Sequence, residues 1–219
     1  LLAYDRRHGY RGPEQQLPPL PEKEKESESK SEPGNTERWS AALANTPAYG
    51  GLVPAIVTSV SEQSFTALLT DGEEVQVEWE DGLSDFRPYL SVNSRGPSPK
   101  SAADLVAIGD LVRLLPLPEE RWQFSQQPAT QAALVSLNAD DGAILSLVGG
   151  FDYQQSKFNR VTQATRQPGS NFKPFIYTAA LENGFTPATI INDAPIVFED
   201  KQLENSWRPE NASGKFYGP

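Results

Sequence analysis

The sequence predicts a mixed fold, in which a small antiparallel β-barrel is followed by the beginning of an α/β domain. Short stretches rich in Val, Ile, Thr and Phe crowd residues 52–117 and are separated by turn residues, which is typical of a small all-β domain. A further hairpin pattern occupies 131–148, and a helical pattern runs from Ser170 to Gly184. Hairpin, turn and helix in this order indicate a helix packed on an antiparallel sheet.

Residues 1–47 are predicted to form an interdomain connector. Its first 13 residues are basic and aromatic and contain His8, the only histidine of the chain. From about 18 to 38 the sequence alternates Glu, Lys, Ser and Pro with hardly an apolar residue. Such a segment cannot bury enough surface to offset its ordering entropy, so we expect a charged, disordered insertion. A tail that recognises a partner is the alternative.

The barrel domain is predicted to span 48–130. Strands are expected at 52–60, 64–70 and 73–79, because these stretches are rich in Val, Ile, Thr and Phe. Asp71-Gly72 between the last two is a strong hairpin signal. A turn followed by one more strand is expected within 105–117. This density of short strands favours an oligonucleotide/oligosaccharide-binding (OB) fold.

An acidic run lies beside these strands. Residues 71–85 hold seven Asp and Glu residues and no Lys or Arg. Such a run is usually a solvated face, and a docking surface for a basic partner is the alternative.

Composition excludes several classes of function. The net charge of −10 argues against nucleic acid or anionic lipid as the main partner. The absence of Cys excludes disulfides and thiolate metal sites, and neither a metal site nor a cofactor fingerprint is apparent. No apolar run approaches the roughly 18 residues of a membrane span. Because the sequence contains no Met, we expect a processed product or a fragment.

Residues 166–175, Arg-Gln-Pro-Gly-Ser-Asn-Phe-Lys-Pro-Phe, carry the candidate reaction centre. Pro168-Gly169 predicts a turn that delivers Ser170 to a helix start, and Lys173 follows on the same helical face. Burial of the apolar helix would favour a neutral Lys173 amine, which could accept the Ser170 proton and create a nucleophile. A lone His8 gives weak support to a Ser-His-Asp triad instead.

The alternative is that Ser170 caps the helix and Lys173 is solvated. Ser27-Glu28-Ser29-Lys30 has the same spacing within the charged run, so spacing alone does not decide between the two. The surrounding sequence is what decides between these two interpretations.

The block Gln167–Phe175 resembles the catalytic serine segment of class A penicillin-binding proteins, the bifunctional peptidoglycan synthases, and most closely their 1A type. The opening Tyr4–Pro13 is similar to the segment that leads out of their glycosyltransferase domain. Further motifs follow in the order that the family shows, namely Gln131–Leu137, Asp141–Leu145, Val148–Gly150, Phe158–Arg160 and Trp207–Asn211.

This resemblance implies a function. Residues 131–219 would be the N-terminal part of a transpeptidase domain, and the barrel would lie between two enzymatic domains. Ser170 would attack a D-Ala-D-Ala stem peptide, Lys173 would be its base, and β-lactams would acylate the same serine. The substrates would be peptidoglycan stem peptides and lipid-linked precursors at the periplasmic face of the inner membrane, with a membrane anchor upstream.

The family's Ser-x-Asn and Lys-Thr-Gly motifs are expected downstream of Ser170, and neither occurs between Ser170 and Pro219, so we expect negligible transpeptidase activity from these 219 residues alone. Trp207 is expected to pack near the helix. Two alternatives remain: a binding or regulatory module whose barrel contacts partner proteins, and a serine β-lactamase, which does not explain the flanking motifs.

Overall fold

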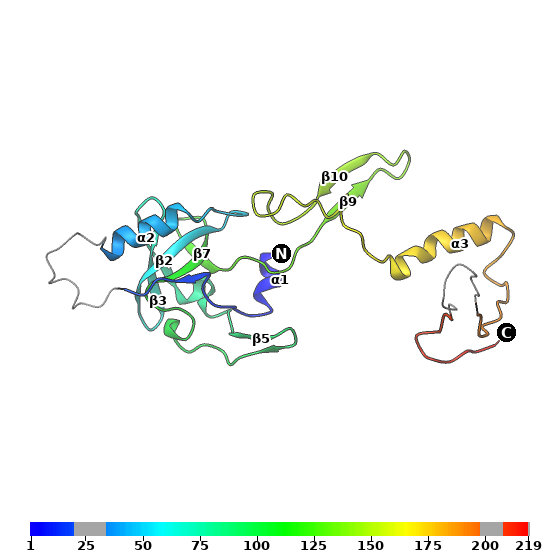
Figure 1. Cartoon of the computed structure of the whole chain (residues 1–219), viewed down its shortest axis with the longest axis horizontal. Helices are drawn as coiled ribbons and strands as arrows, with labels where there is room; N and C mark the ends of the chain where they lie inside the picture. Colours follow the sequence, from blue (N-terminus) through cyan, green and yellow to red (C-terminus); the bar gives the residue numbers. More distant parts are fainter. Residues whose placement is uncertain (20–33, 198–207, 219) are drawn as a thin grey trace. The chain divides into compact units, whose positions relative to one another are not determined.

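A computed structural model describes residues 1–19, 34–197 and 208–218 (Figure 1). These residues form two compact units, Leu1–Ala164 and Thr165–Pro219. Most of the charged run, residues 20–33, lies outside the described residues, as does Trp207. The last residues of that run, 35–38, belong to a helix.

The first unit is built around a six-stranded antiparallel sheet with the strand order β1-β7-β2-β3-β4. β8 shares the outer edge of β7 with β1, because β1 pairs with residues 110–111 and β8 with residues 113–116. The strands are β1 (Gln15–Gln16), β2 (Val53–Val60), β3 (Ser64–Leu69), β4 (Glu74–Glu78), β7 (Asp110–Pro116) and β8 (Trp122–Ser125). The four strands predicted from the sequence are confirmed, while β1 and β8 were not predicted.

Both faces of this sheet are covered. On one face, a core that includes Phe65, Phe86 and Phe124 is fully buried. On the other face, Ile56, Leu68 and Leu111 form a second cluster with Trp39 and Leu43. These last two side chains come from α2 (Asn35–Ala44), which lies along β2 (Figure 1).

The domain is OB-like, but its sheet is open, so the closed barrel that we expected is not formed. β4 ends at Glu78, and the chain turns at once into η2 (Trp79–Leu83). η2 packs against β8, and no strand ladder joins β4 to β8 in the described part of the chain. Gly82 makes this approach possible, since it has a φ of +105° and a Cβ there would lie 2.7 Å from the Phe124 carbonyl oxygen.

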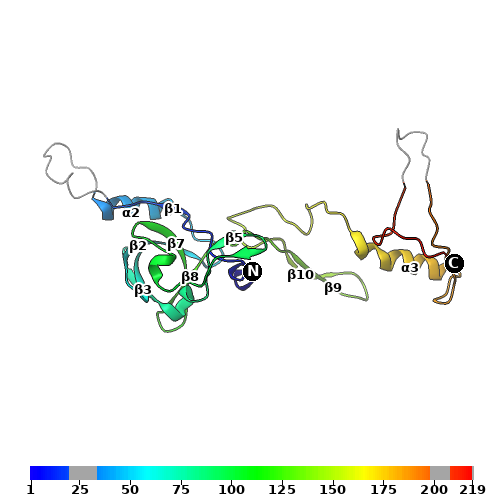
Figure 2. The same ribbon diagram turned by 90° about the horizontal axis from the view of Figure 1, so that it is seen from below.

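Shorter elements complete the first unit. The predicted second hairpin is confirmed as a separate two-stranded sheet of β9 and β10. The shorter elements of the first unit are α1 (Leu2–Arg6), β5 (Tyr89–Ser91), β6 (Ser94–Arg95), η3 (Ala102–Asp104), β9 (Leu134–Leu137) and β10 (Ile144–Val148). Figure 2 shows the hairpins from a second direction.

The second unit contains one turn of 3-10 helix, η4 (Gly169–Phe172), followed directly by α3 (Lys173–Glu182). Its other described residues form turns and irregular segments, apart from an isolated antiparallel bridge between Asp193 and Gly218. None of the helices described in the two units is long and apolar enough to cross a membrane.

Candidate active site

A turn and a short helix place Ser170. Gly169 has a φ of +53°, a conformation that glycine adopts readily, and the Asn171 N–H donates to the Pro168 carbonyl over 3.1 Å. Side chains three residues apart eclipse in a 3-10 turn, so Ser170 and Lys173 lie on the same side. Pro174 at the start of α3 costs no hydrogen bond, because the first N–H groups of a helix have no intrahelical acceptor.

The helix ends where its sequence predicts. Gly184 has a φ of +87°, and its N–H donates to the Leu181 carbonyl over 3.1 Å. The Phe185 N–H donates to the Ala180 carbonyl over 3.1 Å. These bonds satisfy carbonyl groups at the end of α3, so Gly184 is the helix stop.

The predicted burial of this helix is wrong for the residues that the structure describes, because α3 has no buried residue. Phe175 is 68% exposed and Ile176 is 56% exposed. The rings of Phe172 and Phe175 contact each other, with centroids 5.6 Å apart, and so cover only part of their own surface. An apolar helix turned to solvent lacks the neighbours that would desolvate Lys173.

Ser170 and Lys173 are likewise exposed, and no hydrogen bond joins their side chains among the described residues of the second unit. The backbone therefore orders the two groups along one side of a helix start. No buried side chain of α3 surrounds them.

One cluster in the second unit was missed by sequence reasoning. Both Asp193 carboxylate oxygens accept from Asn211 Nδ2, over 2.9 and 2.8 Å, and Asp193 Oδ2 also accepts from the Tyr217 N–H over 2.9 Å. Asn211 ends a motif that carried the family resemblance. These bonds hold Asn211 and Tyr217 to Asp193, and no spacing rule could have paired residues 193 and 211.

His8 lies in the first unit and makes a local contact. Its Nδ1 is 3.1 Å from the Tyr4 carbonyl oxygen, which can only accept, so Nδ1 carries the hydrogen. The Tyr4 ring lies against the imidazole, with centroids 4.6 Å apart. His8 therefore packs against Tyr4 of α1, next to the end of that helix.

The acidic run is only partly a free surface. Asp81 is buried and accepts from Arg121 over 2.6 Å, and Asp85 pairs with Arg6 over 3.4 Å. Glu74 and Glu78 are exposed on β4, an edge strand of the sheet. Charge on an edge strand discourages pairing with another chain.

Two family models match the chain. One, described as the penicillin-binding protein OB-like domain, matches residues 10–130. The other, described as the penicillin binding protein transpeptidase domain, matches residues 132–216 and so includes Ser170 and Lys173.

Curated relatives and a crystal structure agree with these matches. Penicillin-binding protein 1A of Pseudomonas aeruginosa is 48% identical over 220 residues, which cover 100% of this chain and 25% of the relative. The Escherichia coli protein of that name is 41% identical over 100% of this chain and 24% of its own length. The crystal structure of penicillin-binding protein 1A from Haemophilus influenzae matches with a TM-score of 0.62 at 34% identity, over 100% of this chain and 29% of that one. The chain thus spans about a quarter of these relatives.

Proposed function

The chain belongs to the penicillin-binding protein family, and from this premise we propose that it is part of a bifunctional peptidoglycan synthase of the 1A type. In this proposal Ser170 is the nucleophile of a D-Ala-D-Ala transpeptidase and Lys173 is its general base. One observation carries the proposal: within the segment that matches the transpeptidase family, a turn places Ser170 at a helix start with Lys173 one turn later.

The reaction would proceed in two acyl transfers. Lys173 Nζ accepts the Ser170 hydroxyl proton while Ser170 Oγ attacks the carbonyl carbon of the penultimate D-Ala. The terminal D-Ala leaves as an amine that takes up a proton. An amine of a second stem peptide then attacks the acyl-enzyme and releases Ser170. A β-lactam acylates the same oxygen, but its ring-opened product stays attached.

The start of η4 can stabilise the negative charge that develops on the substrate carbonyl oxygen in the transition state. The Ser170 N–H lies in the first turn of η4, where backbone N–H groups are free of intrahelical bonds and can donate to an oxyanion. One oxyanion donor is worth about 3 kcal/mol of transition-state stabilisation. A second donor, and the wall that desolvates Lys173, would come from the remainder of a transpeptidase domain packed on the exposed apolar surface of α3.

The site of action follows from the same proposal. A peptidoglycan synthase works on stem peptides and lipid-linked precursors, so we place the protein at the periplasmic face of the inner membrane, with an anchor upstream of these residues.

A hybrid protein tests the nucleophile. Residues 1–219 would replace the matching quarter of the Pseudomonas aeruginosa relative, and the hybrid would be labelled with fluorescent penicillin. We expect a single adduct that mass spectrometry locates on Ser170 and that Ser170→Ala removes. Lys173→Ala should slow acylation by about 10² or more, because general base catalysis contributes that much.

The matched control is Ser27→Ala, which removes the serine of the other Ser-x-x-Lys sequence and should label like the parent hybrid. Full labelling of a folded Ser170→Ala hybrid would disprove the proposal. The 219 residues alone should show negligible turnover of a D-Ala-D-Ala substrate.

A second candidate function is a binding module, which the exposed acidic side chains of β4 favour. Absence of any adduct in a folded hybrid would support it, since the OB-like domain would then be the functional part.

A further inference from the structure

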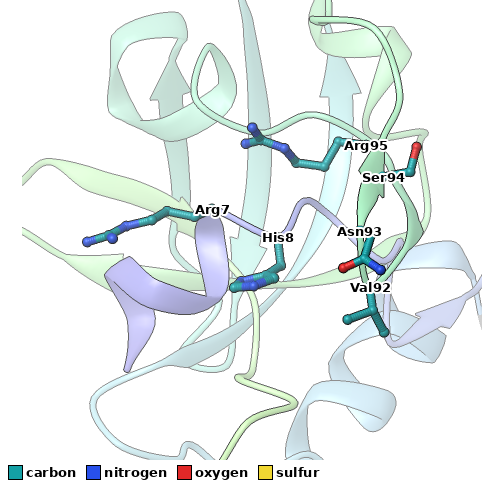
Figure 3. A pocket seen from close by; sticks show the side chains of 6 residues that line it. All are labelled: Arg7, His8, Val92, Asn93, Ser94 and Arg95. Carbon is teal, nitrogen blue, oxygen red and sulfur yellow. The ribbon is translucent and has the colours of Figure 1, made fainter. Parts of the chain in front are cut away.

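A hollow of about 220 Å³ lies in the first unit between the end of α1 and the hairpin formed by β5 and β6. Figure 3 shows the side chains that line it, two from the end of α1 and four from the facing hairpin. They are Arg7, His8, Val92, Asn93, Ser94 and Arg95. We call this hollow the α1–hairpin pocket.

The pocket is basic in an acidic protein. It is lined by two arginines and no carboxylate, although the chain carries a net charge of −10. All four salt bridges among the described residues use other arginines, namely Arg6, Arg11, Arg113 and Arg121. Arg7 and Arg95 are exposed, and their guanidinium groups donate to no acceptor in the described part of the chain. Two positive charges thus border one hollow without a counter-charge.

The walls of the pocket are fixed by backbone hydrogen bonds. The Tyr10 N–H donates to the Arg87 carbonyl over 2.8 Å, and the Tyr89 N–H donates to the Tyr10 carbonyl over 2.8 Å. Gly9 makes this approach possible, since it has a φ of +102° and a Cβ there would lie 2.6 Å from the Arg87 carbonyl oxygen. The end of α1 and the hairpin are therefore joined next to the hollow.

The remaining polar groups are suited to an anion. The Ser94 hydroxyl and the Asn93 amide can donate, while His8 Nδ1 is already held by the Tyr4 carbonyl. The two arginines come from two elements, and the Arg7 side chain, which extends away from the hairpin in Figure 3, can turn toward the hollow because it is exposed and has no acceptor in the described part of the chain. A tetrahedral phosphate offers oxygens in several directions and can use donors from both elements, whereas a planar carboxylate offers two oxygens in one plane.

We infer that the α1–hairpin pocket binds a single phosphate group, carried by a small phosphate ester or by one lipid headgroup. A larger anionic surface is disfavoured, because the rest of the acidic chain would be repelled from it. The size of the hollow leaves room for the group that carries the phosphate, and Val92, which is 75% exposed, offers that group an apolar contact. The pocket lining contains none of the residues of the candidate active site.

Glycerol 1-phosphate titrated into the 219-residue chain at low ionic strength tests the site. Binding should be saturable and should shift the Nε–Hε resonances of Arg7 and Arg95 in NMR spectra. The double variant Arg7→Gln/Arg95→Gln should bind about tenfold more weakly, because it loses two charge-assisted donors. Neither arginine has a partner in the described fold, so the variant should fold like the parent.

The matched control is Lys157→Gln/Arg166→Gln, which removes the same charge from two exposed side chains that do not line the pocket. It should bind like the parent chain. Equal weakening in both double variants, binding of acetate as tight as that of glycerol 1-phosphate, or absence of saturable binding would each overturn the inference. Flotation with phosphatidylcholine vesicles that contain a small fraction of phosphatidylglycerol, and so present little anionic surface, identifies the source. Co-flotation that Arg7→Gln/Arg95→Gln abolishes assigns a lipid headgroup, and its absence beside saturable glycerol 1-phosphate binding assigns a soluble ester.

Discussion

At the scale of single residues, Asp5 connects the beginning of the chain to the exit from the OB-like domain. Its carboxylate accepts from Arg11 Nη1 and Nη2 over 3.1 and 2.8 Å and from Gln126 Nε2 over 2.8 Å. It also accepts from the Ala129 N–H over 3.1 Å. The side chain is 4% exposed, so its partners would lose buried hydrogen bonds if it were removed.

Asp5→Ala should therefore lower the free energy of unfolding of the first unit by about 3 kcal/mol, as expected when one member of a buried ion pair is removed. Urea denaturation measures this loss. Asp85→Ala is the control, because Asp85 is 57% exposed in its pair with Arg6 and should cost less than about 1 kcal/mol. Equal costs for the two changes would contradict the role given to Asp5.

Asp110 makes stability depend on pH in the opposite sense to most carboxylates. Burial raises the pKa of Asp110, although the Ala107 N–H, which donates over 2.8 Å, and Gln16 act to lower it. With a folded pKa above the unfolded one, the folded state binds the proton more tightly, so this group's contribution to stability falls as pH rises through that interval.

Asp110→Asn should accordingly stabilise the protein at pH 7, because the amide carries no charge to desolvate. The gain relative to the parent should disappear near pH 3, where the carboxyl is protonated in both states. Urea titrations of both proteins at the two pH values measure this difference. A gain that is unchanged at pH 3 would assign the effect to hydrogen bonding.

At the scale of elements, α2 closes one face of the sheet. Trp39 is 8% exposed within the cluster over Ile56, and its Nε1–H donates to the Leu17 carbonyl over 3.0 Å. Trp39→Ala should cost about 3 kcal/mol, the lower end of the range for buried aromatic residues, because it leaves both a cavity and an unpaired carbonyl. Glu37→Ala, an exposed change in the same helix, should cost less than about 0.5 kcal/mol by thermal and urea denaturation. A Trp39→Ala protein as stable as Glu37→Ala would show that α2 does not support the sheet.

Local pattern predicted those elements that carry their own signal. The hairpin of β3 and β4 was predictable because Asp71 and Gly72 build its turn: Gly72 has a φ of +89°, and Asp71 Oδ1 accepts from the Glu73 N–H over 3.0 Å. β1 has only two residues and exists through its pairing with Asp110 and Leu111, which no local pattern reveals. The open form of the sheet could not be predicted for a similar reason, since it depends on the packing of η2 against β8.

Some features of the candidate site could likewise be predicted from local sequence, and others could not. The turn at Gly169, the placement of Ser170 and the stop at Gly184 follow from residue types and were predicted. The burial of α3 could not be predicted in this way. An apolar pattern indicates that a helix face needs other residues to pack against it, but it does not show that those residues are present. Apolar residues on α3 therefore indicate where other parts of a folded domain would pack.

At the scale of the whole molecule, burial is confined to one part of the chain. Among the described residues, every buried hydrophobic side chain lies between Tyr10 and Phe124. β9, β10 and α3 contain none, although their exposed residues include Leu134, Ile144 and Phe175. Stability should therefore differ between regions, because local opening requires little free energy where few apolar contacts are broken.

Hydrogen exchange should reveal this difference and link it to function. In the 219-residue chain, amides of β2, β3 and β7 should exchange only through global unfolding, whereas amides of α3 should exchange within about a hundredfold of unfolded rates, since an isolated helix of 10 residues is marginal in water. In the hybrid with the Pseudomonas aeruginosa relative, α3 should become protected to the level of β3. Protection of α3 in the 219 residues equal to that of β3 would contradict this account. A helix that is protected only in the hybrid would instead support the proposal that Ser170 and Lys173 acquire a catalytic environment when the apolar surface of α3 is covered.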